Sequence, residues 1–161
     1  KLATSIKKRP LPNSSDLNDV TSEDVCLANI EISNYSSNLI PCQVSLSSIS
    51  KNGRGFSLEI YGSEGSLILK SENQKDYVHG FNLKYSNNEN KIQNLTADSS
   101  FNFEKTWTDG RIAPVLRIQN LWAQSIINGT PVIPGLCEGL ASHKVCEAIR
   151  ESSKSGLSIK I

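Results

Sequence analysis

The sequence predicts an α+β fold: an open, mostly antiparallel β-sheet of about six to eight strands with two C-terminal helices packed on one face. Two observations support this prediction. Several segments before residue 100 alternate apolar and polar side chains, which is typical of half-buried strands. Two later segments place apolar residues every three or four positions, as amphipathic helices do. The helices follow the strands in the chain, so we expect them to cover the apolar side of one sheet.

The clearest strand signal is a hairpin. Apolar and polar side chains alternate over Phe56–Tyr61 and again over Leu67–Leu69. Gly62 and Gly65 bracket the turn between them, where we expect positive φ angles. Paired glycines also suggest a phosphate-binding loop, but the sequence has neither G-x-x-x-x-G-K-[ST] nor G-x-G-x-x-G here. The alternation resumes directly after the second glycine, so the pattern indicates a hairpin.

The remaining strands are expected on both sides of this hairpin. Residues 1–6 are expected to end a strand, and residues 7–19 to form an exposed loop rich in Pro, Asn and Ser. His79, between aromatic residues in an apolar phase, is interpreted as a packed, hydrogen-bonded side chain. The other predicted strands are 26–32, 40–46, 77–85 and 92–95, with an edge strand and loop over 97–109.

Two helices complete the pattern. The first is expected to begin near Pro114, which suits a first helical turn, and to close before Gly129. The second is expected over residues 136–155, with Gly156 as its stop. Leu157–Ile161 alternates again and is predicted to be the last strand.

Composition limits the function classes. The 161 residues hold 17 basic and 16 acidic side chains, a balance that argues against a nucleic-acid partner. No apolar run approaches the roughly 20 residues of a membrane span, and no signal peptide is visible. The chain begins with Lys1 and contains no Met, so we expect a fragment or a processed product. We expect one sheet domain over residues 1–161, with a loop-rich segment over residues 1–20.

The four cysteines are expected to be buried free thiols. Their spacing includes no C-x-x-C, which argues against zinc. Cys26 and Cys42 occupy apolar phases of predicted strands, and Cys137 and Cys146 fall on opposite sides of a predicted helix. This pattern indicates a reducing compartment and a cytoplasmic location. The alternative of a secreted β-rich binding domain predicts a Cys26–Cys42 disulfide.

Few residues indicate chemistry of their own. With only two histidines, there is no support for a nucleophilic triad, and no clustered ligands indicate a metal site. Two loops have compositions suited to recognition. The loop 52–55 contains Arg54, which suits anionic or hydroxyl-rich ligands. The loop 105–111 places Trp107 beside Lys105, Asp109 and Arg111. The ordinary alternatives are a turn in the first loop and a packing residue at Trp107.

A series of segments carries a family resemblance. It consists of Leu58-Glu-Ile-Tyr-Gly-Ser-Glu-Gly-Ser-Leu67, Ile126-Ile-Asn-Gly-Thr-Pro-Val-Ile-Pro134, Gly139-Leu-Ala-Ser-His-Lys-Val-Cys-Glu-Ala-Ile-Arg-Glu-Ser152 and Gly156-Leu-Ser-Ile-Lys160. In order and spacing this series resembles the C-terminal domain of the glucose–fructose oxidoreductase/inositol dehydrogenase/MocA-like family, and Asp24 resembles the family's entrance into the sheet. The resemblance implies an N-terminal Rossmann domain, absent from this chain, that binds NAD or NADP.

The resemblance also implies a role for this domain. It would complete the pocket for a sugar, nucleotide sugar or cyclic polyol and mediate homo-oligomers, without catalytic, cofactor or metal residues of its own and without activity alone. The candidate substrate-binding residues are Asn52, Arg54, Trp107 and Arg111. A non-catalytic carbohydrate-binding or oligomerisation module is the alternative. The expected subunit interface is the polar outer face of the sheet, comprising Asn29, Glu31, Gln43, Ser45, Ser57, Glu59 and Tyr61.

Overall fold

The computed structural model describes residues 1–33, 38–73, 80–87, 91–99 and 107–161. The expectations for the strand around Tyr77 and His79, and for residues 100–106 of the predicted edge strand and loop, lie outside these residues. The chain divides into two compact units. The first unit comprises Lys1–Lys51 with Ile133–Ile161, and the second comprises Asn52–Val132.

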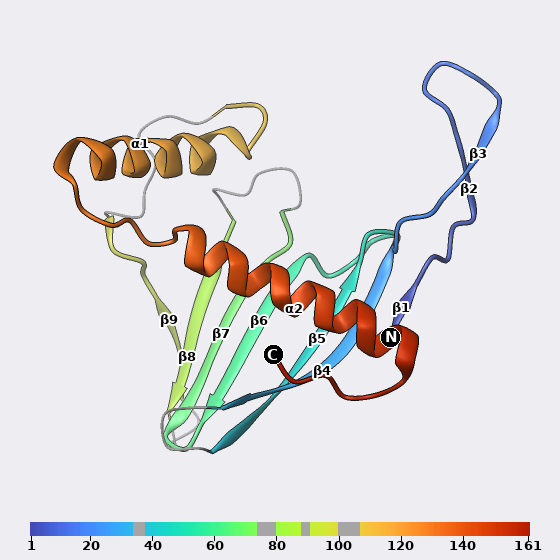
Figure 1. Ribbon diagram of the computed structural model, residues 1–161. Coiled ribbons are helices and arrows are strands. Elements are labelled where there is room, and N and C mark those ends of the chain that lie inside the picture. Colours follow the sequence, from blue (N-terminus) through green and yellow to red (C-terminus); the bar gives the residue numbers. More distant parts are fainter. Residues whose placement is uncertain (34–37, 74–79, 88–90, 100–106) are drawn as a thin grey trace. The chain divides into compact units, whose positions relative to one another are not determined.

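The first unit contains a three-stranded antiparallel sheet in the order β1-β4-β5 (Figure 1). Its strands are β1 (Leu2–Ala3), β4 (Val25–Ser33) and β5 (Leu39–Ser47). In the register, Asn29 lies opposite Gln43, as the alternation predicts for residues that share the polar face. The apolar face includes the half-buried side chains of Cys26, Ala28, Ile30, Cys42 and Val44, which the register places on one side of the sheet.

A two-stranded ribbon interrupts the chain between β1 and β4. Strand β2 (Lys8–Pro10) pairs antiparallel with β3 (Leu17–Asp19), and the amide of Val20 donates to the carbonyl of Lys7 at the base, at 2.8 Å. The sequence predicts a loop here, which is wrong. Proline signals a loop, but both strands of an isolated ribbon are edges, where a proline costs little pairing.

The carboxylate of Asp24 holds the chain where it leaves β1 for the ribbon. Asp24 is buried, with 6% of its surface exposed. Its two oxygens accept hydrogen bonds of 2.8–2.9 Å from the backbone amides of Ser5 and Ile6. Its own amide donates to the carbonyl of Ala3 at 2.9 Å. The bonds from the Ile6 and Ser5 amides stabilise the charged form and lower the pKa of this carboxyl.

Helix α2 (Leu136–Ser155) also belongs to the first unit and contacts β1. The amide of Leu2 donates to Oγ of Ser153 at 2.9 Å, and Arg150 lies 3.7 Å from Glu23 just before β4. The helix ends before Gly156, whose φ of 72° is left-handed, as predicted. Its half-buried stripe has helical spacing and comprises Val145, Ala148, Ile149, Ser152 and Ser153.

The predicted last strand is absent. Leu157–Ile161 forms no ladder with any described strand, and Leu157 and Ile161 are exposed. Alternating side chains predict a strand only where a neighbouring edge supplies hydrogen-bond partners, and this segment has none in the described part of the chain.

The second unit contains a four-stranded antiparallel meander in the order β6-β7-β8-β9. Its strands are β6 (Phe56–Gly62), β7 (Gly65–Ser71), β8 (Asn82–Asn87) and β9 (Ile92–Leu95). The predicted hairpin is β6–β7. A Cβ at Gly65, where φ is 159°, would lie 2.2 Å from the carbonyl oxygen of Ser86, whereas Gly62 lacks the predicted positive φ.

The register gives this sheet two different faces, because directly paired residues point to the same side. One face is apolar and comprises Phe56, Leu58, Ile60, Leu67, Leu69, Leu83, Tyr85 and Leu95 with a few polar residues. We call the opposite side the polar face. It comprises Ser57, Glu59, Tyr61, Ser66, Ile68, Lys70, Asn82, Lys84, Ser86, Ile92 and Asn94.

Helix α1 (Ile112–Asn128) follows in the second unit and ends before Gly129, whose φ of 64° is left-handed, as predicted. Ala113 is buried, whereas Trp122 and Ile126, which lie four residues apart on one side of the helix, are exposed. Among the described residues, neither helix is long and apolar enough to cross a membrane.

The α+β class, the antiparallel pairing and the two helices near the C-terminus are confirmed. The described strands form three sheets, of three, two and four strands. The residues expected on one outer face therefore fall on two of these sheets, one in each unit.

Candidate ligand site on the four-stranded sheet

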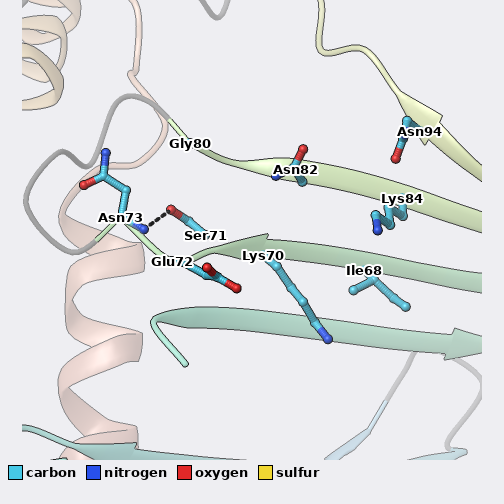
Figure 2. A pocket seen from close by; sticks show the side chains of 9 residues that line it. All are labelled: Ile68, Lys70, Ser71, Glu72, Asn73, Gly80, Asn82, Lys84 and Asn94. Atoms are coloured by element: carbon cyan, nitrogen blue, oxygen red, sulfur yellow. Dashed lines mark hydrogen bonds between the residues drawn. The ribbon is translucent and has the colours of Figure 1, made fainter. Parts of the chain in front are cut away.

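A depression of about 580 Å³ lies on the four-stranded sheet, near the point where β7 ends and β8 begins (Figure 2). Figure 2 shows that side chains from three neighbouring strands contribute to it. Its lining comprises Ile68, Lys70, Ser71, Glu72, Asn73, Gly80, Asn82, Lys84 and Asn94. Ammonium, carboxamide, hydroxyl and carboxylate groups therefore surround one hollow.

The strand register brings the polar side chains of this depression together. Lys70 on β7 lies opposite Asn82 on β8. Lys84 on β8 lies opposite Ile68 on one side and Asn94 on the other. Direct partners in antiparallel strands are close neighbours on the same face, so residues far apart in sequence line one surface.

Close backbone packing shapes the end of the depression. Ser71 is buried, and its Oγ accepts a hydrogen bond from the amide of Asn73 at 3.2 Å. Gly80 has a φ of 87°, and a Cβ there would lie 3.1 Å from Cβ of Asn73. Gly55 has a φ of 76°, and a Cβ there would lie 2.1 Å from the carbonyl oxygen of Ser71. The loop 52–55 therefore ends directly against the strand that lines the depression.

A hydrogen-bonded network occupies the polar face beside the depression. Glu59 accepts bonds from the hydroxyls of Tyr61 at 2.7 Å and Ser57 at 3.2 Å, and it lies 3.0 Å from Nζ of Lys70. The Tyr61 hydroxyl, followed by Lys70, lowers the pKa of Glu59, and the same carboxylate raises the pKa of Tyr61. Lys70 thus already has a counter-charge.

Lys84 differs from Lys70 in its surroundings. It is exposed, and no ion pair in the described part of the chain engages it. The acidic residue in the lining, Glu72, lies four residues beyond Ile68, the direct partner of Lys84. Four residues of extended chain span about 13 Å. The depression therefore has a cationic end and an acidic end.

Asn52 and Arg54, two of the predicted site residues, lie in the loop before β6. Asn52 adopts a positive φ of 53°, and both side chains are exposed. Neither residue lines the depression, although Gly55, the last residue of their loop, packs against Ser71.

The other two predicted site residues lie before helix α1. Trp107 is half-buried. Arg111 forms a bidentate pair with Asp109: Nε donates to Oδ1 at 2.9 Å, and a terminal nitrogen donates to Oδ2 at 2.7 Å. The guanidinium, together with the Arg111 amide, lowers the pKa of Asp109 to about 2. Neither Trp107 nor Arg111 lines the depression.

The sequence prediction did not include the residues that line the depression, notably Lys70, Asn82, Lys84 and Asn94. Strand alternation signals Asn82 and Lys84, which stand between apolar residues and hence point to the opposite face. Lys70 and Asn94 each have a polar neighbour in the sequence, so alternation indicates their face less clearly. The cross-strand register that joins them cannot be derived from alternation alone.

The register also tests the Cys26–Cys42 disulfide that a secreted β-rich binding domain would contain. Cys26 lies opposite Leu46, and Cys42 lies opposite Ile30. The two cysteines are thus offset by four residues, or about 13 Å along the strands, whereas a disulfide needs Cα atoms within about 7 Å. This sheet cannot accommodate a Cys26–Cys42 bridge.

The glycine pair of the β6–β7 hairpin does not form a dinucleotide-binding loop. Gly62 and Gly65 belong to an antiparallel hairpin, and neither lies at the N-terminus of a helix. The described parts of the chain also contain no group of three or more His, Cys, Asp or Glu side chains placed to hold a metal ion.

Comparison with known proteins assigns the chain to a family. Residues 5–161 match the family described as "Oxidoreductase family, C-terminal alpha/beta domain", that of the glucose–fructose oxidoreductase/inositol dehydrogenase/MocA proteins. The chain belongs to this family. It is also 38% identical over 152 residues to an uncharacterized oxidoreductase of Synechocystis sp., a match that covers 94% of this chain and 40% of that protein. The chain thus spans about 40% of the length of this relative. No solved structure matches.

Proposed function

We propose that this chain is the substrate-side and oligomerisation domain of an NAD(P)-dependent oxidoreductase that acts on a sugar, a nucleotide sugar or a cyclic polyol. The observation that carries the proposal is the family match over residues 5–161. The nicotinamide would accept or supply the hydride in the complete protein. The cofactor and the acid–base residues would be held outside this chain, and the 161 residues alone would not be catalytic.

Asn52, Arg54, Trp107 and Arg111 are the proposed substrate-binding residues. The position of loop 52–55 supports the first two, since Gly55 packs against the strand that lines a polar depression. Arg111 would act together with Asp109, because the two side chains already form a bidentate pair. A paired guanidinium keeps its orientation and retains donors for a substrate hydroxyl.

A homo-oligomer formed through the polar sheet faces is part of the proposal. Exposed polar side chains along Asn29–Glu31 and Ser57–Tyr61 support it, as such faces can pair across a two-fold axis. Sedimentation of the protein at increasing concentration measures the association, and a monomer at the highest concentration would contradict it. The proposal also includes a cytoplasmic location, supported by cysteine spacing that does not suit a disulfide framework.

The test is hydride transfer by the complete protein that contains this domain. Absorbance of the reduced nicotinamide is followed with NAD and NADP over a panel of sugars, nucleotide sugars and polyols. We expect turnover with one class, and Arg54→Ala should raise KM about tenfold with little change in kcat if Arg54 only binds substrate. Lys144→Ala, on the exposed side of α2, is the control variant. Absence of turnover with every class and both cofactors would overturn the proposal.

A further inference from the structure

We propose that the depression on the four-stranded sheet binds a hydroxyl-rich molecule that carries one anionic group, a carboxylate or a phosphate, with this group held at Lys84. Lys84 and Asn94 are direct cross-strand partners, and both line the hollow (Figure 2). The site differs from the substrate-binding residues proposed above, none of which lines it. It lies on β7–β9, whereas the residues of this sheet in the proposed subunit interface, Ser57, Glu59 and Tyr61, lie on β6 and do not line it.

The difference between Lys70 and Lys84 indicates which of them binds the anion. Lys70 lies 3.0 Å from Glu59, so an anion at Lys70 would compete with a carboxylate already in position. No described ion pair engages Lys84. An incoming anion therefore pairs with Lys84 without displacing a counter-charge. The bond between an ammonium and an anionic oxygen is charge-assisted and stronger than one between neutral groups.

The asparagines supply recognition of hydroxyl groups. Asn94 lies beside Lys84 in the register, and Asn82 lies opposite Lys70. Each carboxamide offers both a donor and an acceptor, and a hydroxyl group can satisfy both. Carboxamides from two adjacent strands therefore suit a ligand with several hydroxyls next to its anionic group.

Glu72 limits the charge of the ligand. It lies at the end of the depression opposite Lys84, about 13 Å along the strand direction. A carboxylate accepts hydrogen bonds from hydroxyls but repels a second anionic group. The arrangement suits one terminal anion and disfavours a ligand with anions at both ends.

This inference goes beyond the proposed function, because none of the proposed substrate-binding residues lines the depression. The hydroxyl-rich part of the ligand rests on Asn82 and Asn94, whereas the anionic part rests on Lys84. The experiment measures binding by calorimetry to the complete protein without nicotinamide, so that its outcome is separate from hydride transfer. The probes are glucose, glucuronate, glucose 6-phosphate and inorganic phosphate.

We expect glucuronate or glucose 6-phosphate to bind, and the tighter of the two identifies a carboxylate or a phosphate as the preferred anion. Lys84→Ala should weaken this binding about tenfold, whereas Lys84→Arg should retain it within about threefold, because it keeps the charge. Asn94→Ala should weaken it about fivefold. Binding should also decrease with added NaCl. Lys144→Ala, which removes an exposed lysine that does not line the hollow, should have no effect.

Equal affinity for glucose and glucuronate, or unchanged affinity in Lys84→Ala, would overturn the proposal. So would equal affinity for inorganic phosphate and glucose 6-phosphate, since the hydroxyls would then contribute nothing. Circular dichroism of each variant checks that the exposed substitution preserves the fold. Ligand binding without turnover for any substrate would contradict the proposed oxidoreductase function while supporting this inference.

Discussion

Two carboxylates, one in each unit, illustrate different uses of a polar group on a sheet. Asp24 in the first unit is buried and accepts its hydrogen bonds from the backbone amides of Ser5 and Ile6. Glu59 in the second unit is partly exposed, and its partners are the side chains of Ser57, Tyr61 and Lys70. Both environments lower the carboxyl pKa, but only the first fixes the path of the chain.

Asp24 is a polar group that the fold needs, whereas Glu59 is a polar group that the fold can lose. Removal of Asp24 would leave the part-buried hydrogen bonds of the Ser5 and Ile6 amides without their acceptor, which is costly. Removal of Glu59 would release Lys70 and Tyr61 to water, which costs little. The second unit can therefore change the chemistry of its polar face with small effects on stability, a property expected of a surface that recognises ligands.

The largest expected effect on stability comes from a substitution at Gly55, not from one at Asp24 or Glu59. Gly55→Ala places a Cβ 2.1 Å from the carbonyl oxygen of Ser71 at a φ of 76°. We expect a loss of about 3 kcal/mol in the stability of the second unit, measured by thermal unfolding. Gly139→Ala is the matched control in α2, where no described atom lies within 4 Å of the new Cβ. It should stabilise the helix by about 1 kcal/mol. Equal effects of the two substitutions would contradict close packing at Gly55.

Asp24→Asn should lower the melting temperature by several degrees at pH 7, because an amide cannot accept the same set of backbone bonds. The folded state lowers the pKa of Asp24. Its contribution is therefore present above the unfolded pKa of about 3.9 and is lost as the pH falls through the folded value. The gap between wild type and variant should narrow below about pH 4. A gap that is constant between pH 7 and pH 3 would show that the charge of Asp24 is not responsible.

Arg111→Ala tests the pair with Asp109. It should change the pKa of Asp109 clearly but the melting temperature only slightly. The guanidinium holds the pKa of Asp109 at about 2. Its removal should raise that pKa towards the usual value of about 3.9, observed by NMR of the Asp109 carboxyl. The pair is exposed, so the melting temperature should change little. An unchanged pKa would mean that the two side chains do not pair in solution.

Tyr61→Phe is expected to have the smallest effect, because it removes one exposed hydrogen bond to Glu59. The pKa of Glu59 should rise, while the melting temperature at pH 7 should change by about a degree or less. The raised pKa of Tyr61 means that its contribution is present below the unfolded value of about 10 and is lost as the pH rises through the folded value. A decrease of several degrees in the melting temperature at pH 7 would show that the fold depends on the hydrogen bonds of Glu59.

Local patterns in the sequence predicted the elements whose partners follow closely in the chain. The β6–β7 hairpin follows from alternation around a short turn, and both helix ends follow from Gly129 and Gly156. The ribbon β2–β3 was not predicted, since strands of three residues are too short to show a period. The strand predicted at Leu157–Ile161 is the opposite error. Its side chains alternate, but no described strand pairs with it.

The candidate site was harder to predict from the sequence because it depends on pairing between strands. Asn82 and Lys84 could each be assigned to a polar face from alternation, but only the register places them and Asn94 around one depression. The bidentate pair at Arg111 also depends on a turn geometry that sequence spacing does not determine. Arg54 was predicted from its glycine-flanked loop, and the structure adds the contact of Gly55 with Ser71.

The anchored base of the β2–β3 ribbon makes its tip a place for chemical labelling. Asp24 holds the chain on one side of the base, and the bond from Val20 to Lys7 closes it. The tip turns at Asn13, and its residues are exposed. A cysteine or a short peptide tag inserted there would leave the sheet register unchanged. The ribbon therefore offers a position for a spectroscopic probe outside the three-stranded sheet of its own unit.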